Sequence, residues 1–252
     1  MKTRILSSYI DSTTYENTYE SICRFLLNAD HPSYITVNNV HSVVEGALNT
    51  EYGKIINDGF MALPDGRPLS LIARWKGDKN MERVFGPSLL EKVIDWSQNS
   101  KNSHYFFGST QETLDLIKKK IEINYSHANI SGYKSPPFRE LTPEENQSYI
   151  NQMNEVRADI IWVGLGAPKQ EIWMANNYAM LDRGIMIGIG AGFDYLAGQT
   201  KHAPNWMKYF ALEWLFRLIQ EPKRLWKRYF ITIPIFIALN FMEIIKRNFF
   251  TR

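Results

Sequence analysis

Short apolar runs alternate along this chain with longer segments whose apolar residues recur at helical spacing. The short runs are rich in β-branched and aromatic side chains, which is typical of buried strands. They predict strands at 34–38, 61–63, 104–107, 160–163 and 185–187, and a further strand at 121–130.

Helical spacing follows most of these runs. It predicts helices at 15–29, 41–49, 69–75 and 111–120. After a loop at 131–142, another helix is expected to begin at Thr142, with Pro143 in its first turn. The repeated strand–helix order predicts an α/β fold: a mostly parallel sheet flanked by helices, in a Rossmann-like arrangement.

Glycine-bearing turns follow two of the predicted strands. Gly164 and Gly166 come after the strand at 160–163, and Gly190 comes after the strand at 185–187. Glycine tolerates positive φ and lets backbone N–H groups approach a phosphate closely. In a parallel sheet both turns lie at the carboxyl edge, where ligands bind. We therefore expect a nucleotide site at this edge.

The character of the sequence changes after Thr200. Residues 206–229 interleave aromatic with basic side chains, and an apolar run follows at 230–242. A spanning helix needs ~20 apolar residues, whereas this run is shorter and contains Pro234 and Asn240. Three arrangements stay open: a helix lying on a membrane, a helix packed on the body, and a spanning helix. The flanking Arg, Lys, Trp and Tyr favour the first.

The net charge of the sequence also changes after Thr200. After Thr200, ten Lys and Arg stand against three Glu, a formal charge of +7, so the +3 of the whole chain leaves −4 for the first 200 residues. A basic end on an acidic body favours an anionic partner, either a lipid surface or a phosphate-rich ligand. We expect an α/β nucleotide-binding domain at 1–200 and a basic, aromatic, helical appendage at 201–252 that associates with a membrane.

Composition narrows the class of protein further. The chain has 252 residues, 44% of them apolar, which is enough to bury a full core. Cys23 is the only cysteine, so we expect no internal disulfide, no thiolate metal cluster and a reducing compartment. The polar N-terminus has no apolar stretch typical of a secretion signal, which favours the cytoplasm. The five histidines are scattered, and we expect no metal site.

Several long motifs resemble one known family. They are residues 159–171, residues 190–224, and Pro64-Asp65-Gly66 followed by Glu82 to Gly86. Together they resemble the WecG/TagA/CpsF family of bacterial glycosyltransferases, over most of the chain from about residue 34 to 229. The stretches at 65–69, 135–139 and 225–229 are most similar to its exopolysaccharide branch.

This resemblance implies an inverting transfer that needs no metal ion and no cofactor. A sugar, N-acetylmannosamine in the best-known members, would pass from a UDP donor to an undecaprenyl-diphosphate-linked sugar. The partners are then a UDP-sugar, a polyprenyl-diphosphate-linked acceptor and the inner face of the cytoplasmic membrane, with no nucleic acid. The donor sugar stays open between N-acetylmannosamine-like sugars, glucose and related hexoses.

Asp65 lies in a Pro-Asp-Gly turn after the strand at 61–63. The resemblance implies that it is the general base that takes a proton from the acceptor hydroxyl. A free Asp side chain has a pKa of ~3.9 and is ionised at neutral pH, although a sugar hydroxyl must be held close to lose its proton. The alternative is an ordinary turn residue. Asp58 is the nearest rival, and we expect it in a loop.

Thr36, Asn38 and Arg83 match other motif positions of the family. Thr36 and Asn38 point to the same side of their strand, because side chains alternate along it. The resemblance puts them near the donor sugar and the base, while capping of the strand end is the alternative. An arginine can hold a diphosphate with two parallel hydrogen bonds. A surface arginine paired with Glu82 is the alternative for Arg83.

Two helix starts are candidate phosphate sites. Gln170 and Glu171 follow Gly164 and Gly166, where backbone N–H groups and the helix dipole favour anions. The glycine spacing alone is a weak signal, and the resemblance strengthens it. Gly108 and Ser109 precede another helix; they could bind uridine or phosphate, or only cap that helix.

Arg217, Arg224 and Arg228 are spaced seven and four residues apart, close to one face of a helix. The resemblance implies that at least one reaches the UDP diphosphate, while a basic stripe facing the membrane fits the spacing equally well. Ser88 and Arg67 depart from the family motifs, which usually have an aspartate and a smaller or apolar residue there. These departures bear on the identity of the donor sugar.

Two other classes of function stay open. A nicotinamide-dependent oxidoreductase could use a similar sheet, but it needs an acidic residue at the end of the second strand, where this chain has glycines 188 and 190. A membrane-associated scaffold without chemistry would use the glycine turns only to shape the fold. The C-terminal segment could also close over the site or pair two subunits of a homo-oligomer.

Overall fold

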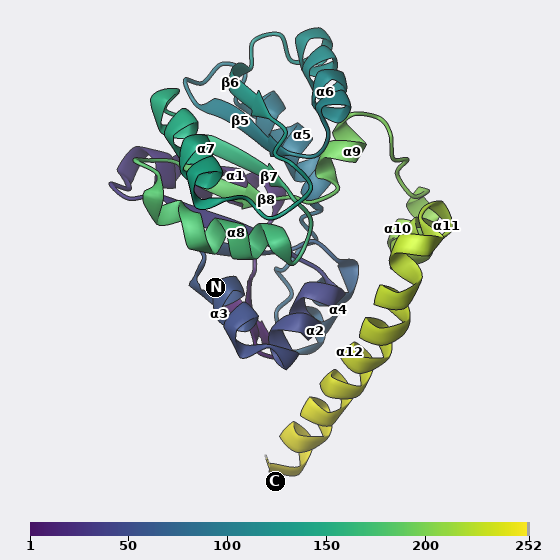
Figure 1. The fold of residues 1–252 in the computed structure, drawn as a ribbon. Helices are drawn as coiled ribbons and strands as arrows, with labels where there is room; N and C mark the ends of the chain where they lie inside the picture. The colour runs from purple at the N-terminus through teal and green to yellow at the C-terminus, as the bar shows by residue number, and fades with distance from the viewer. Residues whose placement is uncertain (251–252) are drawn as a thin grey trace.

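The centre of the molecule is a six-stranded sheet in which every neighbouring pair is parallel. The computed structural model describes residues 1–250, with side chains as far as residue 243. The strand order is β4-β3-β8-β7-β5-β6 (Figure 1). The strands are β3 (Ser33–Asn38), β4 (Met61–Pro64), β5 (Ser103–Gly108), β6 (Asn129–Lys134), β7 (Ile160–Gly164) and β8 (Ile185–Gly188). The predicted α/β fold is confirmed, and all six strands end at one edge.

Helices cover both faces of this sheet, which is why its central strands are continuous apolar runs. One face carries α1 (Tyr15–Asn28), α5 (Gly86–Trp96), α6 (Gln111–Asn124) and α9 (Gly192–Leu196). The other carries α7 (Pro143–Glu155), α8 (Lys169–Asn177) and the short 3-10 helix η1 (Tyr178–Met180). Side chains alternate between the faces: Trp162 packs in the first core, and Ile161 and Val163 pack in the second.

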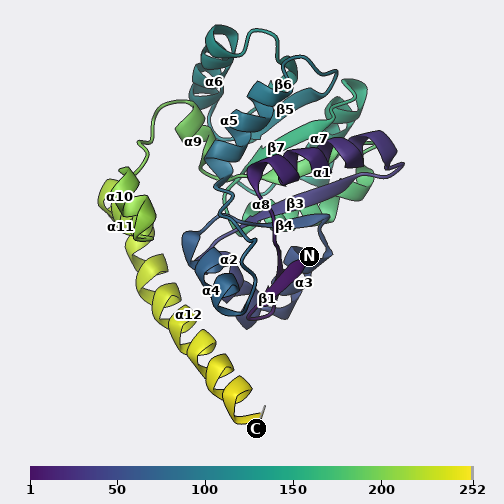
Figure 2. The same cartoon turned by 180° about the vertical axis from the view of Figure 1, so that it is seen from behind.

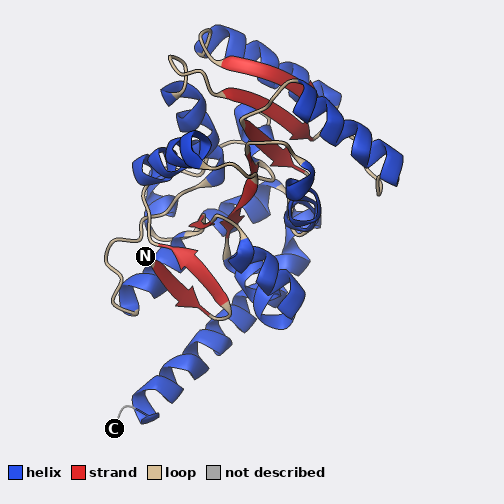
Figure 3. Ribbon diagram, turned by 90° about the vertical axis from the view of Figure 1, so that its left-hand side faces the viewer, coloured by secondary structure: helices blue, strands red, loops and turns tan. Residues whose placement is uncertain are grey.

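A third core forms beyond the β4 edge of the sheet. It contains α2 (Val40–Leu48), α3 (Thr50–Asp58), α4 (Arg67–Trp75) and an antiparallel hairpin of β1 (Lys2–Ile5) and β2 (Ser8–Asp11) (Figure 3). Ile5 and Ile10 of the hairpin are fully buried there, and the Ala62 N–H donates to Asp11 Oδ2 at 2.8 Å. The sequence pattern did not predict this hairpin, since each strand has only four residues.

Some predicted boundaries are wrong. The strand expected at 121–130 is instead the end of α6 and the start of β6, because Leu114, Ile117 and Ile121 continue one buried helical face. The loop expected at 131–142 contains the last four residues of β6. As an edge strand, β6 is only partly buried and has no apolar run. Asp58 ends helix α3 and does not lie in a loop.

The start of α7 is confirmed in detail. Thr142 is the N-cap, and its side chain accepts from the Glu145 N–H. The Glu145 carboxylate in turn accepts from the Thr142 N–H. Pro143 occupies the first turn, where its missing N–H costs nothing. This boundary was predictable because a capping box is local in sequence.

Three helices follow the sheet: α10 (Asn205–Tyr209), α11 (Glu213–Gln220) and α12 (Pro222–Phe250). The long helix α12 runs away from the sheet and passes α2 on its way (Figures 1 and 2). Phe236 packs into the third core, and Lys76 Nζ lies 2.9 Å from Glu243 Oε2. None of the helices described is long and apolar enough to cross a bilayer.

His104 is a fully buried polar group between α5 and the sheet. Trp162 donates its indole N–H to His104 Nδ1 at 3.1 Å, so the ring proton is on Nε2, which lies 2.7 Å from Ser97 Oγ. Ser97 in turn donates to the Ile94 carbonyl. Burial lowers the pKa of His104 to about 4, because a charged imidazole cannot be hydrated there.

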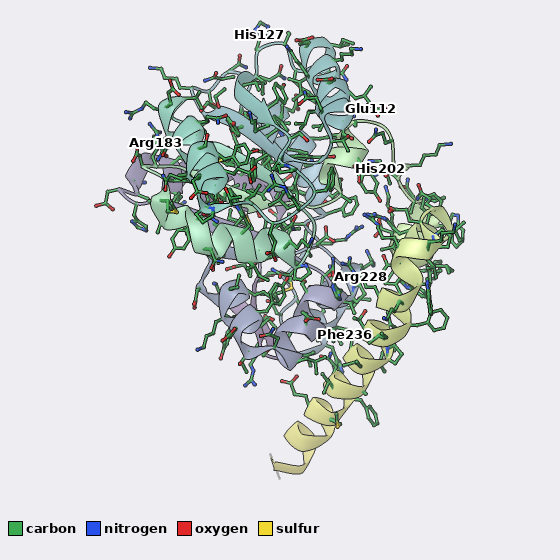
Figure 4. The ribbon with its side chains drawn as sticks, viewed as in Figure 1. Glu112, His127, Arg183, His202, Arg228 and Phe236 are labelled. Atoms are coloured by element: carbon green, nitrogen blue, oxygen red, sulfur yellow. The ribbon has the colours of Figure 1, made fainter. Side chains whose placement is uncertain are left out.

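We expect this histidine to make the fold acid-sensitive. In the unfolded chain its pKa is ~6.5, so its contribution to stability is complete above that pH and is lost as the pH falls toward 4. The loss is ~1.4 kcal/mol per pH unit. Urea unfolding of the natural chain and His104→Gln at pH 7 and 4.5 should show a steeper decline in the natural chain. The exposed His127 (Figure 4) provides the control variant, His127→Gln. Equal declines in all three proteins would contradict the assignment.

Candidate active site

The ends of β3 and β4 bring several of the predicted site residues together. Asn38 and Pro64 are partners in the parallel register, and the Asp65 N–H donates to the Asn38 carbonyl at 2.8 Å. Asn38 Nδ2 donates to Thr36 Oγ1 at 2.8 Å, and both side chains are fully buried. Asn38 Oδ1 has no hydrogen-bond partner. Thr36 and Asn38 thus share one side of β3, directly behind the Asp65 turn.

The Asp65 carboxylate lies at the N-terminus of α5. Its Oδ1 accepts from the Gly86 N–H at 2.7 Å, and its backbone carbonyl accepts from Arg83 Nε at 2.6 Å. Burial raises the pKa of Asp65, while the Arg83 cation and the Gly86 N–H oppose this rise. The result is a carboxylate more basic than a free one and held in a fixed position.

Arg83 also contacts the C-terminal helices. Its Nη1 lies 2.5 Å from Oε2 of Glu213, the first residue of α11, and its guanidinium lies 4.3 Å from the centroid of the Phe85 ring. The sequence suggested Glu82 as a surface partner of Arg83, but in the structure its partner is Glu213, which lies 130 residues further along the chain. Arg83 is therefore part of the site that contains Asp65.

A cavity of about 330 Å³ lies over Asp65, between the carboxyl edge of the sheet and the C-terminal helices. Its charged lining residues are Asp65, Arg67, Arg83, Glu213, Arg217 and Arg228. Its apolar lining residues include Val40, Trp214, Ile233, Phe236 and Ile237. The cavity is therefore cationic on one part of its wall and apolar on another.

The three tail arginines do not share one helical face. The helix breaks at Glu221, so Arg217 belongs to α11, whereas Arg224 and Arg228 belong to α12. Arg217 pairs with Glu221 at 2.8 Å and lines the cavity; Arg228 also lines it. Arg224 is exposed and pairs with Glu221 at 2.5 Å. The prediction that the three arginines lie close to one helical face is therefore wrong.

Gln170 and Glu171 are buried at the start of α8. Gln170 Oε1 accepts from the Gly166 N–H at 3.2 Å and the Gly190 N–H at 2.8 Å, so one side chain ties both glycine turns together. Gln170 Nε2 donates to Glu171 Oε1 at 2.7 Å. Burial raises the pKa of Glu171, and the Arg228 cation opposes this rise.

Arg228 connects the appendage to the same turn. Its Nη2 donates to the Ala167 carbonyl at 3.1 Å. This contact fixes the guanidinium between the cavity over Asp65 and the turn that follows β7. The sequence left open which tail arginine reaches the UDP diphosphate. Among the described side chains, Arg228 is hydrogen-bonded to this turn.

Ser109 and Gly164 line a second cavity, of about 600 Å³. The Ser109 N–H donates to the Gly164 carbonyl at 3.2 Å. Gly108 has φ +133°, and a Cβ there would lie 2.5 Å from the Gly164 carbonyl oxygen, so the close approach of the two turns requires glycine. Thr110, not Ser109, caps α6. Of the predicted residues, Asp65, Arg83, Arg217 and Arg228 line the first cavity, and Ser109 and Gly164 line the second. The residues that line neither cavity are Thr36, Asn38, Gly108, Gly166, Gln170, Glu171 and Arg224.

Sequence reasoning missed some lining residues of the first cavity. His41 was not proposed for the site, while Glu213 and Arg67 lay in motif stretches but were given no role in the site. Burial and the nearby Arg228 lower the pKa of His41 to about 4, and its Nδ1 has no hydrogen-bond partner among the described residues. Within the part of the chain that is described, no three His, Cys, Asp or Glu side chains form a group that could hold a metal ion.

Comparisons with known proteins found one matching family and several similar proteins. The sequence model of the glycosyl transferase WecG/TagA/CpsF family matches residues 3–249. The N-acetylglucosaminyldiphosphoundecaprenol N-acetyl-beta-D-mannosaminyltransferase of Bacillus subtilis (strain 168) is 27% identical over 184 residues, 73% of this chain and 69% of the relative. An enzyme of the same name from Bacillus spizizenii is 23% identical over 212 residues, which cover 84% of this chain and 80% of the relative. Another, from Staphylococcus aureus strain MW2, is 24% identical over 237 residues, which cover 94% of this chain and 91% of the relative.

Proposed function

The chain belongs to the glycosyl transferase WecG/TagA/CpsF family and is a hexosyltransferase, and from this premise we propose the reaction. A sugar passes from a UDP donor to an undecaprenyl-diphosphate-linked glycan, with inversion and without a metal ion, in the synthesis of a cell-surface polysaccharide. The donor sugar is N-acetylmannosamine-like, glucose or a related hexose. The oxidoreductase and scaffold hypotheses gain no support, because the relatives named above are glycosyltransferases.

The observation that carries this proposal is the Asp65 carboxylate in a cavity lined by arginines. Asp65 takes the proton of the acceptor hydroxyl, whose oxygen attacks the anomeric carbon of the donor. One C–O bond forms as the bond from that carbon to the UDP oxygen breaks, and UDP leaves with the bonding electron pair. Asp65 suits this role because burial raises its pKa, which makes the carboxylate a stronger base than a free one.

Departing UDP needs cations, because negative charge grows on its diphosphate. Arg83 and Arg228 are assigned this role. Arg228 is held by Ala167 beside the turn that contains Gly164 and Gly166, and it forms no ion pair with a described carboxylate. Ser109 and Gly164 line the second cavity, which we assign to the uridine. Thr36, Asn38, Gln170 and Glu171 then support the site from behind, through buried hydrogen bonds.

The lipid-linked acceptor places the enzyme at the inner face of the cytoplasmic membrane. The exposed aromatic side chains of α10, of Phe210 directly after it and of α12 support this location. They include Trp206, Tyr209, Phe210, Trp226 and Phe230, each at least half exposed. Aromatic and basic side chains together favour the headgroup layer of an anionic bilayer. The segment 201–252 is therefore proposed as the membrane-docking part of the chain, and 1–200 as the catalytic part.

Replacing Asp65 tests the reaction directly. Asp65→Asn keeps the shape and can still accept from the Gly86 N–H, but it removes the base. We expect UDP release in the presence of a lipid-diphosphate acceptor to fall about 10²- to 10⁴-fold, with UDP affinity nearly unchanged by calorimetry. The control is Asp58→Asn, at the end of α3, which should keep full activity. Full turnover by Asp65→Asn would eliminate Asp65 as the base.

Arg228 is tested by UDP binding alone. Arg228→Gln removes a charged donor to the diphosphate, so we expect UDP affinity to drop about 10- to 100-fold. The neighbouring exposed Lys227 gives the matched control, Lys227→Gln, whose UDP affinity should equal that of the natural chain. Thermal unfolding of each variant shows whether it is folded. A folded Arg228→Gln variant with natural affinity would contradict the assignment.

Membrane docking is tested by sedimentation with phosphatidylglycerol vesicles. We expect binding that weakens in 1 M NaCl, where screening shortens the Debye length to ~3 Å. Trp226→Ser with Phe230→Ser should reduce the bound fraction without changing UDP affinity. The control replaces two exposed apolar residues of the body, Leu27 and Ile123, with Ser. The proposal fails if the control and the Trp226/Phe230 variant lose equal binding, or if the natural chain never sediments with the vesicles.

A further inference from the structure

Arg67 is a cation of the first cavity that the reaction above does not use. It opens helix α4 and lines the cavity two residues after Asp65. No ion pair joins it to a carboxylate among the side chains described, and residues 244–252 contain no Asp or Glu. Its Nε is buried and has no hydrogen-bond partner among the residues whose side chains are described.

Each of the other arginines of this cavity has an ion pair or a hydrogen bond with another group of the protein. Arg83 pairs with Glu213, Arg217 pairs with Glu221, and Arg228 donates to the Ala167 carbonyl. The guanidinium carbon of Arg67 lies 5.3 Å from the centroid of the Tyr209 ring. A guanidinium that lines a cavity without an ion-pair partner among the described side chains favours an anionic ligand, and its planar donors fit a phosphate in particular.

The cavity also has an apolar wall that a nucleotide does not need. Val40 of α2 and Ile233, Phe236 and Ile237 of α12 line it. Phe236 follows Arg228 by eight residues, so the wall extends about 12 Å along α12 from the charged part. Ile237 is 62% exposed, which leaves this end of the cavity open to the surroundings. A ligand with an anionic group and a hydrocarbon chain matches both parts.

We propose that Arg67 binds the diphosphate of the lipid-linked acceptor, and that the first prenyl units lie along Val40, Ile233 and Phe236. This inference rests on the proposed function, which places the acceptor hydroxyl at Asp65. In an acceptor with a single sugar, the diphosphate is attached to the same ring as that hydroxyl, so a phosphate-binding cation must lie close to Asp65. Arg67, on the same turn, meets this requirement. It leaves Arg83 and Arg228 for the donor.

The test compares two acceptors that differ only in phosphate. One is N-acetylglucosamine linked through a diphosphate to a short prenyl chain, and the other is the alkyl glycoside of the same sugar with a chain of equal length. The ratio of their kcat/KM values measures recognition of the diphosphate. We expect Arg67→Gln to reduce this ratio about 10- to 100-fold, with UDP affinity unchanged. Arg67→Lys should keep part of the ratio.

Two further variants separate binding from a structural role. Arg74→Gln removes an exposed arginine from the same helix and should keep the natural ratio. Tyr209→Leu removes the ring beneath Arg67 without removing the charge, and it should also keep the ratio. A natural ratio in Arg67→Gln, or an equal loss in Tyr209→Leu, would overturn the proposal.

A binding measurement keeps the test independent of catalysis. Farnesyl diphosphate is titrated into the natural chain and Arg67→Gln with UDP at saturation. We expect about 10-fold weaker binding or more in the variant. If neither acceptor supports transfer by the natural chain, the proposed function fails, and this titration still decides on Arg67. Equal affinities would refute the phosphate contact even in an active enzyme.

Discussion

The site depends on one partly buried guanidinium, that of Arg83, which joins three separate parts of the chain. It donates to the carbonyl of Asp65, pairs with Glu213 and lies over the ring of Phe85. Removing two charges from water costs several kcal/mol per ion, so such a pair is tolerated only when its geometry is good and its other donors are satisfied. Because Glu213 opens α11, this contact fixes the start of the C-terminal helices over the sheet edge. Arg217 and Arg228 take their places over Asp65 as a consequence.

Helix α12 packs on the body with one side and exposes aromatic side chains elsewhere. One side contributes Phe236 to the core around α2 and is held further along by the pair of Lys76 and Glu243. The other side exposes Trp226 and Phe230. Packing on the body and the proposed contact with lipid are therefore compatible, since they use opposite sides. The apolar wall of the cavity lies on the packed side, next to the surface that we propose faces the membrane.

Burial and nearby cations have opposite effects on the pKa values of the buried carboxyl groups. Burial raises the pKa values of Asp65 and Glu171, and the nearby cations Arg83 and Arg228 respectively oppose this rise. Each buried carboxylate thus has its own arginine within Coulombic reach. Among the side chains described, Arg67 has neither an ion pair with a carboxylate nor a hydrogen bond from its guanidinium, whereas Arg83 and Arg217 form ion pairs and Arg228 donates to the Ala167 carbonyl. This asymmetry would be removed by a bound diphosphate.

The sequence by itself determined the strand and helix pattern, the capping box at Thr142, the turn position of Asp65 and the change of character after Thr200. These features are local, because burial periodicity, capping and turn chemistry act over a few residues. The hairpin of β1 and β2 and the edge strand β6 gave too little apolar signal to be predicted. The resemblance to a family supplied the candidate roles, which local chemistry left open.

Only the tertiary structure decided which distant groups meet. Arg83 pairs with Glu213 instead of its neighbour Glu82, and Arg228 reaches Ala167, because the packing of α11 and α12 on the sheet edge sets these contacts. The helix break at Glu221 put Arg217 and Arg224 on different helices despite their helical spacing. A linear pattern fixes the direction of a side chain only within one uninterrupted element. Where that element then lies depends on contacts made far away along the chain.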